Sequence, residues 1–180
     1  MSDGRTTMLH GAAARRSIHS ISGAVLACFW LVGCAALADG GEEELAAANL
    51  PGFGAVRLIA ASEPDASPPA AQLLLQQEGG AVAYRFAPPP GSGEFAFYRV
   101  AEARFTDLDG DGQDDLVAVI EYVTGIGPGG AEPFPLAAVY LRRGEAFEPD
   151  AAREARVNAP PAYDQWHDLA TLLPQLDDAR

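Results

Sequence analysis

Residues 105–123 read FTDLDGDGQDDLVAVIEYV, an aspartate-rich turn followed directly by an apolar run. The turn places five aspartates in nine positions, and the run has apolar residues on both of its alternating faces. A strand with two apolar faces is covered on both sides in a folded protein. The stretch therefore predicts a central strand over residues 116–123, with an acidic loop packed against its start.

The aspartates of the turn follow a regular spacing. Counting from the first of them, carboxylates occupy positions 1, 3, 5 and 9, namely Asp107, Asp109, Asp111 and Asp115. Alternate residues of a tightly curled loop point their oxygens toward a common centre, and Gly112 at position 6 permits the sharp turn. Calcium collects about six to eight such oxygens. The loop is therefore a candidate calcium site, in which Gln113 offers its backbone carbonyl.

The pattern D-x-D-x-D-G-x-x-D with strands on both sides resembles the calcium loops of FG-GAP and VCBS-type repeats, found in the propellers of integrin α-subunits. The resemblance covers residues 100–124 and implies one calcium ion, with the ligands Asp107, Asp109, Asp111, Gln113 and Asp115. The first half is also similar to an EF-hand loop, but position 12, where an EF-hand has its glutamate, is Ala118. Those repeats build a propeller from several copies, so this single copy does not imply that fold.

Two other interpretations of the turn stay open from the sequence. One is a solvated acidic turn that binds no metal. The other is a phosphatase site, because FTDLDG resembles the first motif of haloacid dehalogenase phosphatases, with Asp107 as nucleophile and Asp109 as acid/base. Against it, the threonine position of that motif is Asp111, and the chain has no lysine to serve as the cationic partner of that family.

Five further apolar runs, separated by loops rich in proline and glycine, have the length and composition of strands. They are residues 54–60, 71–77, 81–86, 95–105 and 136–143. The tail, residues 150–158 and 164–176, has helical spacing instead, with an apolar stripe of Trp166, Leu169, Leu172 and Leu173. We expect a mainly β (α+β) fold, an antiparallel sheet of about six strands with a C-terminal helix packed on one face.

The composition limits the classes of function. The chain has 180 residues, 48% of them hydrophobic, which suits one globular domain and a targeting segment. Its 25 acidic residues face 12 basic ones, all of them arginine, for a net charge of -13. Nucleic-acid binding requires a basic surface that displaces counterions, so no nucleic-acid partner is expected. The absence of lysine excludes Schiff-base chemistry.

The first part of the chain reads as an export signal. Arg15 and Arg16 precede the apolar run ISGAVLACFWLVGCAALA, and an acidic stretch follows abruptly. Within it, the residues LVGC resemble the lipobox of bacterial lipoproteins, which implies cleavage before Cys34 and a diacylglycerol on its thiol. Cleavage after Ala38 by the ordinary signal peptidase stays open, as does a single-pass membrane helix. Residues 1–33 are thus expected to be a lipoprotein-type signal peptide, 34–50 an acidic tether, and 51–180 a single β-rich calcium-binding domain.

Other candidate sites are weaker. Residues 125–130 formally satisfy G-x-G-x-x-G, but Pro133 and Pro135 follow too closely for the helix that a dinucleotide site requires. We expect the loop 125–135 to be either a plain connector or a binding edge for a protein or polysaccharide partner. Glu121, on the otherwise apolar central strand, is the carboxylate most open to a raised pKa, or it simply pairs with an arginine. His167 is expected on the surface or packed against a helix.

Together these patterns predict a calcium-binding lipoprotein of the bacterial cell envelope. It would be exported, held at the membrane by its lipid anchor, and would act as a non-enzymatic binding or structural module with Ca2+ as its cofactor. The alternative is an exported, hydrolase-like enzyme. A pocket that gathers Glu121, Arg104 and His167 would favour the enzyme, and an exposed apolar patch around residues 126–134 would favour the binding module.

Overall fold

The apolar run after the aspartate-rich loop forms strand β6, Asp115–Val123, and both of its faces are covered. Leu116, Ile120 and Tyr122 enter the apolar core on one side of the strand. Val117 and Val119 enter a second core on the other side. The prediction of a central, doubly covered strand is therefore confirmed.

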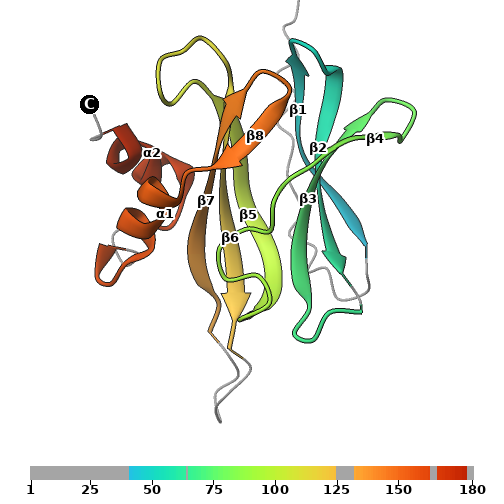
Figure 1. Ribbon diagram of the computed structural model, residues 1–180. Coiled ribbons are helices and arrows are strands. Elements are labelled where there is room, and N and C mark those ends of the chain that lie inside the picture. The colour runs from blue at the N-terminus through green and yellow to red at the C-terminus, as the bar shows by residue number, and fades with distance from the viewer. Residues whose placement is uncertain (1–40, 64, 125–131, 163–165, 178–180) are drawn as a thin grey trace, which may run out of the picture. The chain divides into compact units, whose positions relative to one another are not determined.

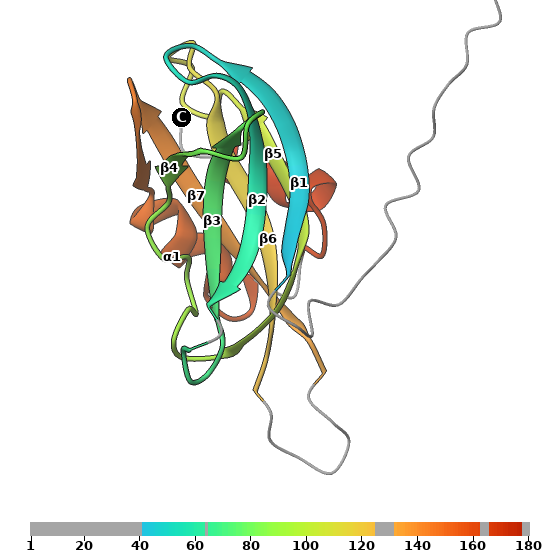
Figure 2. The ribbon, with the colours of Figure 1, turned by 90° about the vertical axis from the view of Figure 1, so that its right-hand side faces the viewer.

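The computed structural model describes residues 41–63, 65–124, 132–162 and 166–177, which belong to one compact unit, Ala35–Arg180. In this unit two antiparallel sheets of four strands face each other (Figures 1 and 2). The sheet with β6 has the order β5-β6-β7-β8, with β5 Ala96–Thr106, β7 Phe134–Arg143 and β8 Ala146–Pro149. The other sheet has the order β1-β2-β3-β4, with β1 Glu42–Leu50, β2 Gly54–Glu63, β3 Ala70–Gln77 and β4 Val82–Arg85.

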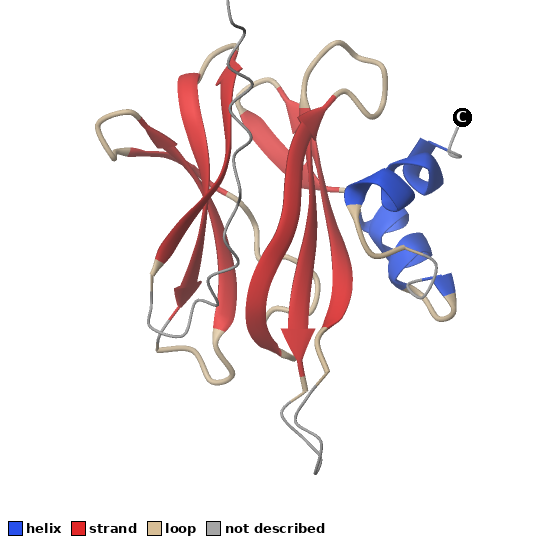
Figure 3. Ribbon diagram, turned by 180° about the vertical axis from the view of Figure 1, so that it is seen from behind, coloured by secondary structure: helices blue, strands red, loops and turns tan. Residues whose placement is uncertain are grey.

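This unit has three layers, with helices α1, Ala151–Asn158, and α2, Leu169–Asp177, on the outer face of the β5–β8 sheet (Figure 3). The inner core lies between the sheets and includes Leu58 of β2, Leu73 of β3 and Phe86 just after β4. The outer core lies between the second sheet and the helices. As β6 belongs to both cores, the loop at its start is fixed to the best-packed part of the unit.

The expected single sheet of about six strands is wrong, because the strands form two sheets. All six predicted strands exist, and two of them, β3 and β4, pair as an antiparallel hairpin. Alternation along a strand shows which residues face a core, but it does not show which strands pair. After β4, the proline-rich segment 87–95 carries the chain to the other sheet, where β5 pairs with β6.

Residues 42–50 are strand β1 rather than part of an acidic tether. They pair with β2 through the turn at Pro51–Phe53, where Gly52 adopts a positive φ of 86°. Glutamate and alanine have weak strand propensity, which explains why this segment was not predicted as a strand. Leu45, Ala46 and Ala48 nevertheless pack against the inner core, so burial of these side chains outweighs propensity.

The tail forms two helices instead of one. Leu169 and Leu172 of the predicted stripe are buried in α2, Trp166 is buried just before it, and Leu173 is partly buried. The indole of Trp166 donates to Val157 O at 3.1 Å, which joins the two helices. Across the residues that the structure describes, neither helix has the length and apolarity needed to cross a membrane.

Candidate metal site

The loop between β5 and β6 is folded around its own carboxylates. Asp107 accepts hydrogen bonds from Gly110 N at 2.7 Å and Gly112 N at 3.1 Å. Both glycines have positive φ, 78° and 83°, a conformation that other residues rarely adopt. The spacing of aspartate and glycine thus produces the tight turn that the sequence predicted.

Three of the predicted ligands come together. One carboxylate oxygen each of Asp107, Asp109 and Asp115 lies within 4.8 Å of the others. Two oxygens on opposite sides of a calcium ion are about 4.6 to 5.2 Å apart, which is twice the calcium–oxygen distance. The three oxygens are therefore close enough for one ion of that size to contact all of them. An all-oxygen donor set of this kind suits hard cations such as calcium or magnesium.

Asp115 is the buried member of this cluster, with no exposed surface. Its two oxygens accept from Leu108 N at 2.8 Å and from Arg142 N at 2.7 Å. Burial raises the pKa of Asp115 against these hydrogen bonds, and the negative charges of Asp109 and Asp111 add to the rise. A bound cation would remove this opposition to ionisation.

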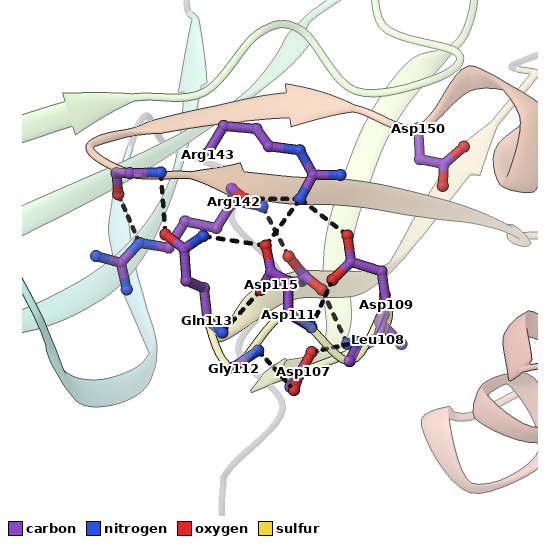
Figure 4. Close-up of polar contacts among 12 residues, drawn as sticks. Asp107, Leu108, Asp109, Asp111, Gly112, Gln113, Asp115, Arg142, Arg143 and Asp150 are labelled. Atoms are coloured by element: carbon purple, nitrogen blue, oxygen red, sulfur yellow. Dashed lines mark hydrogen bonds and ion pairs between the residues drawn. The ribbon is translucent and has the colours of Figure 1, made fainter.

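Arg143, at the end of β7, supplies a positive charge to the loop. Its Nη1 lies 2.8 Å from Asp109 Oδ2 and 3.1 Å from Asp111 Oδ2 (Figure 4). Partial burial of Asp109 opposes its ionisation. The hydrogen bond from Arg143 outweighs this and keeps the pKa of Asp109 below its usual value. One guanidinium cannot neutralise the five carboxylates between residues 107 and 115.

The hairpin between β7 and β8 holds the loop from the other side. Gly144 N donates to Gln113 Oε1 at 3.0 Å, and Gln113 Nε2 donates to Asp111 Oδ2 at 3.0 Å. The sequence interpretation missed Arg142, Arg143 and Gly144. The run Arg-Arg-Gly-Glu after an apolar strand signals a hairpin turn, but nothing in it shows that the turn meets the aspartate loop.

Arg142 extends this contact to the first sheet. It is 2% exposed, and its guanidinium donates to Pro51 O in the β1–β2 turn and to Gly144 O. The guanidinium also lies over the rings of Phe53 and Phe147, at 5.6 and 6.0 Å from their centroids. The loop, the β7–β8 hairpin and the β1–β2 turn are thus connected at one end of the sandwich.

The structure brings some of the proposed ligands together and separates others. Asp107, Asp109 and Asp115 converge, whereas Asp111 is outside the cluster and binds Arg143 and Gln113. The side chain of Gln113 is engaged by Gly144. Asp114, which falls outside the ligand spacing, is exposed.

The residues considered for an enzymatic site do not come together. Glu121 binds Arg99 on the adjacent strand, with 2.7 Å between Oε2 and Nε, which is the ion pair that the sequence allowed. Arg104 and His167 are exposed. An apolar surface pocket of about 500 Å³ is lined by none of these three, but by Phe95, Thr124, Phe134, Leu136 and Asn158.

Some expectations fall on residues outside the described ranges. The signal peptide, Cys34 and the first part of the expected tether precede residue 41, and residues 125–131 of the expected binding loop are also outside. The described end of that loop leads into β7, where Phe134 packs edge-on against Phe95 with 5.0 Å between ring centroids.

Comparison of the chain with protein-family models, with curated proteins and with solved structures found no match.

Proposed function

We propose that this β-sandwich is a calcium-binding module without enzymatic activity, in which one ion bound by loop 107–115 fixes one end of the fold. The observation that carries the proposal is the convergence of Asp107, Asp109 and Asp115. Their positions in the loop, 1, 3 and 9, are those expected from the spacing of the aspartates.

The surroundings of the cluster support a structural role for the ion. Asp115 holds the start of β6 to Leu108 and to Arg142 of β7, so an ion on this carboxylate acts on three chain segments. Metal binding to a site that forms only in the folded chain adds directly to folding stability. Calcium would offset the repulsion between carboxylates that the single guanidinium of Arg143 leaves uncompensated.

The contact of Glu121 supports the non-enzymatic proposal, because its carboxylate is paired with Arg99 on the adjacent strand. This ion pair stabilises the sheet and gives Glu121 a role in the fold. His167 is exposed, and its backbone N–H donates to Thr171 Oγ1 beside the start of α2.

A lipid anchor at Cys34 completes the proposal and rests on the lipobox-like residues 31–34 alone. The chain would then be exported and held at the bacterial cell envelope. Three acyl chains, as in mature bacterial lipoproteins, anchor a protein firmly where one binds only marginally. Wild-type protein should partition into detergent and incorporate a labelled fatty acid, whereas Cys34→Ala should do neither. Export of an unlabelled soluble product that begins at Asp39 would contradict the anchor.

The metal proposal is tested by titration calorimetry with calcium, magnesium and zinc chlorides on the full chain. Calcium should bind at one site, with a dissociation constant of roughly 10⁻⁶ to 10⁻³ M, and more tightly than zinc. Asp107→Asn and Asp109→Asn should remove most of the binding, because each takes one carboxylate from the cluster. Asp114→Asn is the matched control and should bind as wild type does. Tight zinc binding without calcium binding, or equal loss in the control, would refute the site.

A further inference from the structure

One edge of β7 is completed by a helix. Strand β8 pairs with β7 only from Tyr140 to Arg143, so the half of β7 from Phe134 to Val139 is not covered by β8. Helix α1 lies alongside this half of the strand (Figure 1). Unpaired N–H and C=O groups on a strand edge must be satisfied by another segment or by water.

Polar groups of α1 satisfy the β7 edge residue by residue. Asn158 accepts from Ala137 N at 2.8 Å and donates to Ala137 O at 2.9 Å. Two residues further, Glu154 Oε1 accepts from Val139 N at 2.9 Å, and the backbone N–H of the N-cap residue Asp150 donates to Val139 O at 2.8 Å. The helix and its N-cap residue therefore make the hydrogen bonds that an adjacent strand would make.

The repeats of the two elements explain how a helix can do this. Glu154 and Asn158 are four residues apart, so their side chains share one face of α1 and are spaced by about 6.0 Å along its axis. The outward groups of a strand recur every two residues, about 6.6 to 6.8 Å. Pro135, the next residue of this edge, has no N–H to satisfy.

Glu154 is the group in this contact whose charge can change near neutral pH. Its carboxylate accepts from Val139 N, and its charge interacts with the phenol of Tyr140 on β7 and with Asp150, the N-cap residue of its own helix. Arg153 beside it is engaged by Asp150 and by Leu176 O of α2. Burial raises the pKa of Glu154 to about 7, and the charge of Asp150 adds to the rise. The hydrogen bond from Val139 N acts in the other direction and lowers the pKa, but it does not outweigh burial.

We propose that α1 is a pH-responsive cover of the β7 edge, which the neutral Glu154 side chain holds closed and which ionisation of this carboxyl loosens. In the open state the carboxyl is solvated and returns to its ordinary pKa of 4.5. Glu154 has the higher pKa in the closed state. The free energy by which its protonation favours closure is therefore fully present below about pH 4.5 and is lost as the pH rises through about 7. Asp150 has the opposite effect, because its pKa is lowered in the fold and its ionised form favours the closed state. This effect changes only below about pH 3.8, the ordinary pKa of an aspartate.

Hydrogen exchange tests the cover, on the full chain between pH 5.5 and 8 and after correction for intrinsic exchange rates. The opening constant reported by the amides of Ala137, Val139 and α1 should rise roughly 10- to 30-fold across this range, as the change in pKa from 4.5 to about 7 implies. Strands β2 and β3 are the internal reference and should keep their protection. Uniform opening of all elements would show global unfolding and overturn the proposal.

Variants identify the responsible group. Glu154→Gln keeps an acceptor for Val139 N without a charge, so its opening constant should be independent of pH. Glu148→Gln removes an exposed carboxylate from β8 and should keep the wild-type pH profile. His167→Gln is a second control, which removes the described histidine from the protein. A flat profile for wild type, or an unchanged slope in Glu154→Gln, would overturn the proposal. The wild-type profile decides the matter even if a variant does not fold.

Discussion

The backbone N–H of Arg142 donates to the carboxylate of Asp115 at 2.7 Å, although the two residues are 27 positions apart. The register of β6 on β7 pairs Leu116 with Tyr140, and beyond that pair the backbone ladder ends. The side chain of Asp115 takes over the pairing at this point, and its other oxygen holds Leu108 N. A candidate metal ligand is therefore also a structural part of the sheet.

Asp115→Asn should destabilise the fold even without a metal. Asparagine keeps one acceptor, but its amide group would face an N–H donor, which leaves one buried backbone group unsatisfied. Such a loss costs about 1 to 3 kcal/mol of unfolding free energy. Urea denaturation in the presence of a chelator measures it. Asp114→Asn is exposed and should stay within about 0.5 kcal/mol of wild type. Equal stability of the two variants would refute the role given to Asp115.

This double role explains which parts of the site the sequence could predict. Asp107, Asp109 and Asp115 follow a local spacing, so their convergence could be expected from the loop alone. Arg142 and Arg143 reach the loop only through the register of β6 on β7, which no local pattern encodes. The same limit applies to the fold. The apolar residues on both alternating faces of residues 116–123 predicted β6. Strand β1 and the division into two sheets depend instead on packing between distant segments.

The cap of α1 should give the protein a defined sensitivity to acid. Asp150 accepts from Arg153 N at 3.0 Å and is paired with the Arg153 side chain. Burial opposes ionisation, but these hydrogen bonds dominate and lower the pKa of Asp150. Because the pKa of Asp150 is depressed in the folded state, its ionised carboxylate stabilises the fold above about pH 3.8. This stabilisation is lost as the pH falls further. Asp150→Ala should cost about 1 kcal/mol of unfolding free energy at pH 7 and much less near pH 2.5.

Denaturant unfolding of wild type and Asp150→Ala at these two pH values measures the difference. The exposed Asp65, in the turn between β2 and β3, provides the control variant Asp65→Ala. A cost for Asp150→Ala that is the same at both pH values would show that the charge of Asp150 contributes nothing to the cap.

Substitution of two glycines that have the same backbone conformation distinguishes the cost of backbone strain from the cost of a steric clash. Gly91 and Gly93 have φ of 80° and 79°. A Cβ atom on Gly91 would lie 2.7 Å from Leu136 Cδ1 and 3.2 Å from Phe95 Cδ2, whereas one on Gly93 would meet nothing within 4 Å. Gly93→Ala should therefore cost about 1 kcal/mol for the left-handed backbone alone. Gly91→Ala should cost about 1 to 3 kcal/mol more, because the partly buried side chains of Leu136 and Phe95 must shift. Equal thermal melting temperatures would contradict this reasoning.

Calcium should stabilise the protein, and Arg143 should limit how much. At a calcium concentration 100-fold above the dissociation constant, the linkage gain is about 2.7 kcal/mol, or several degrees in melting temperature for a domain of this size. Asp109→Asn should lose most of this rise, because it removes a converging carboxylate. Arg143→Gln should show a larger rise than wild type, since its apo form lacks the guanidinium that binds Asp109 and Asp111.

Thermal melts with chelator and with millimolar calcium compare these variants. The ionic strength is held fixed, because salt alone also screens exposed repulsion. Asp114→Asn should retain the wild-type rise. If wild type and Asp109→Asn shift equally, calcium acts by screening and the loop is not its site.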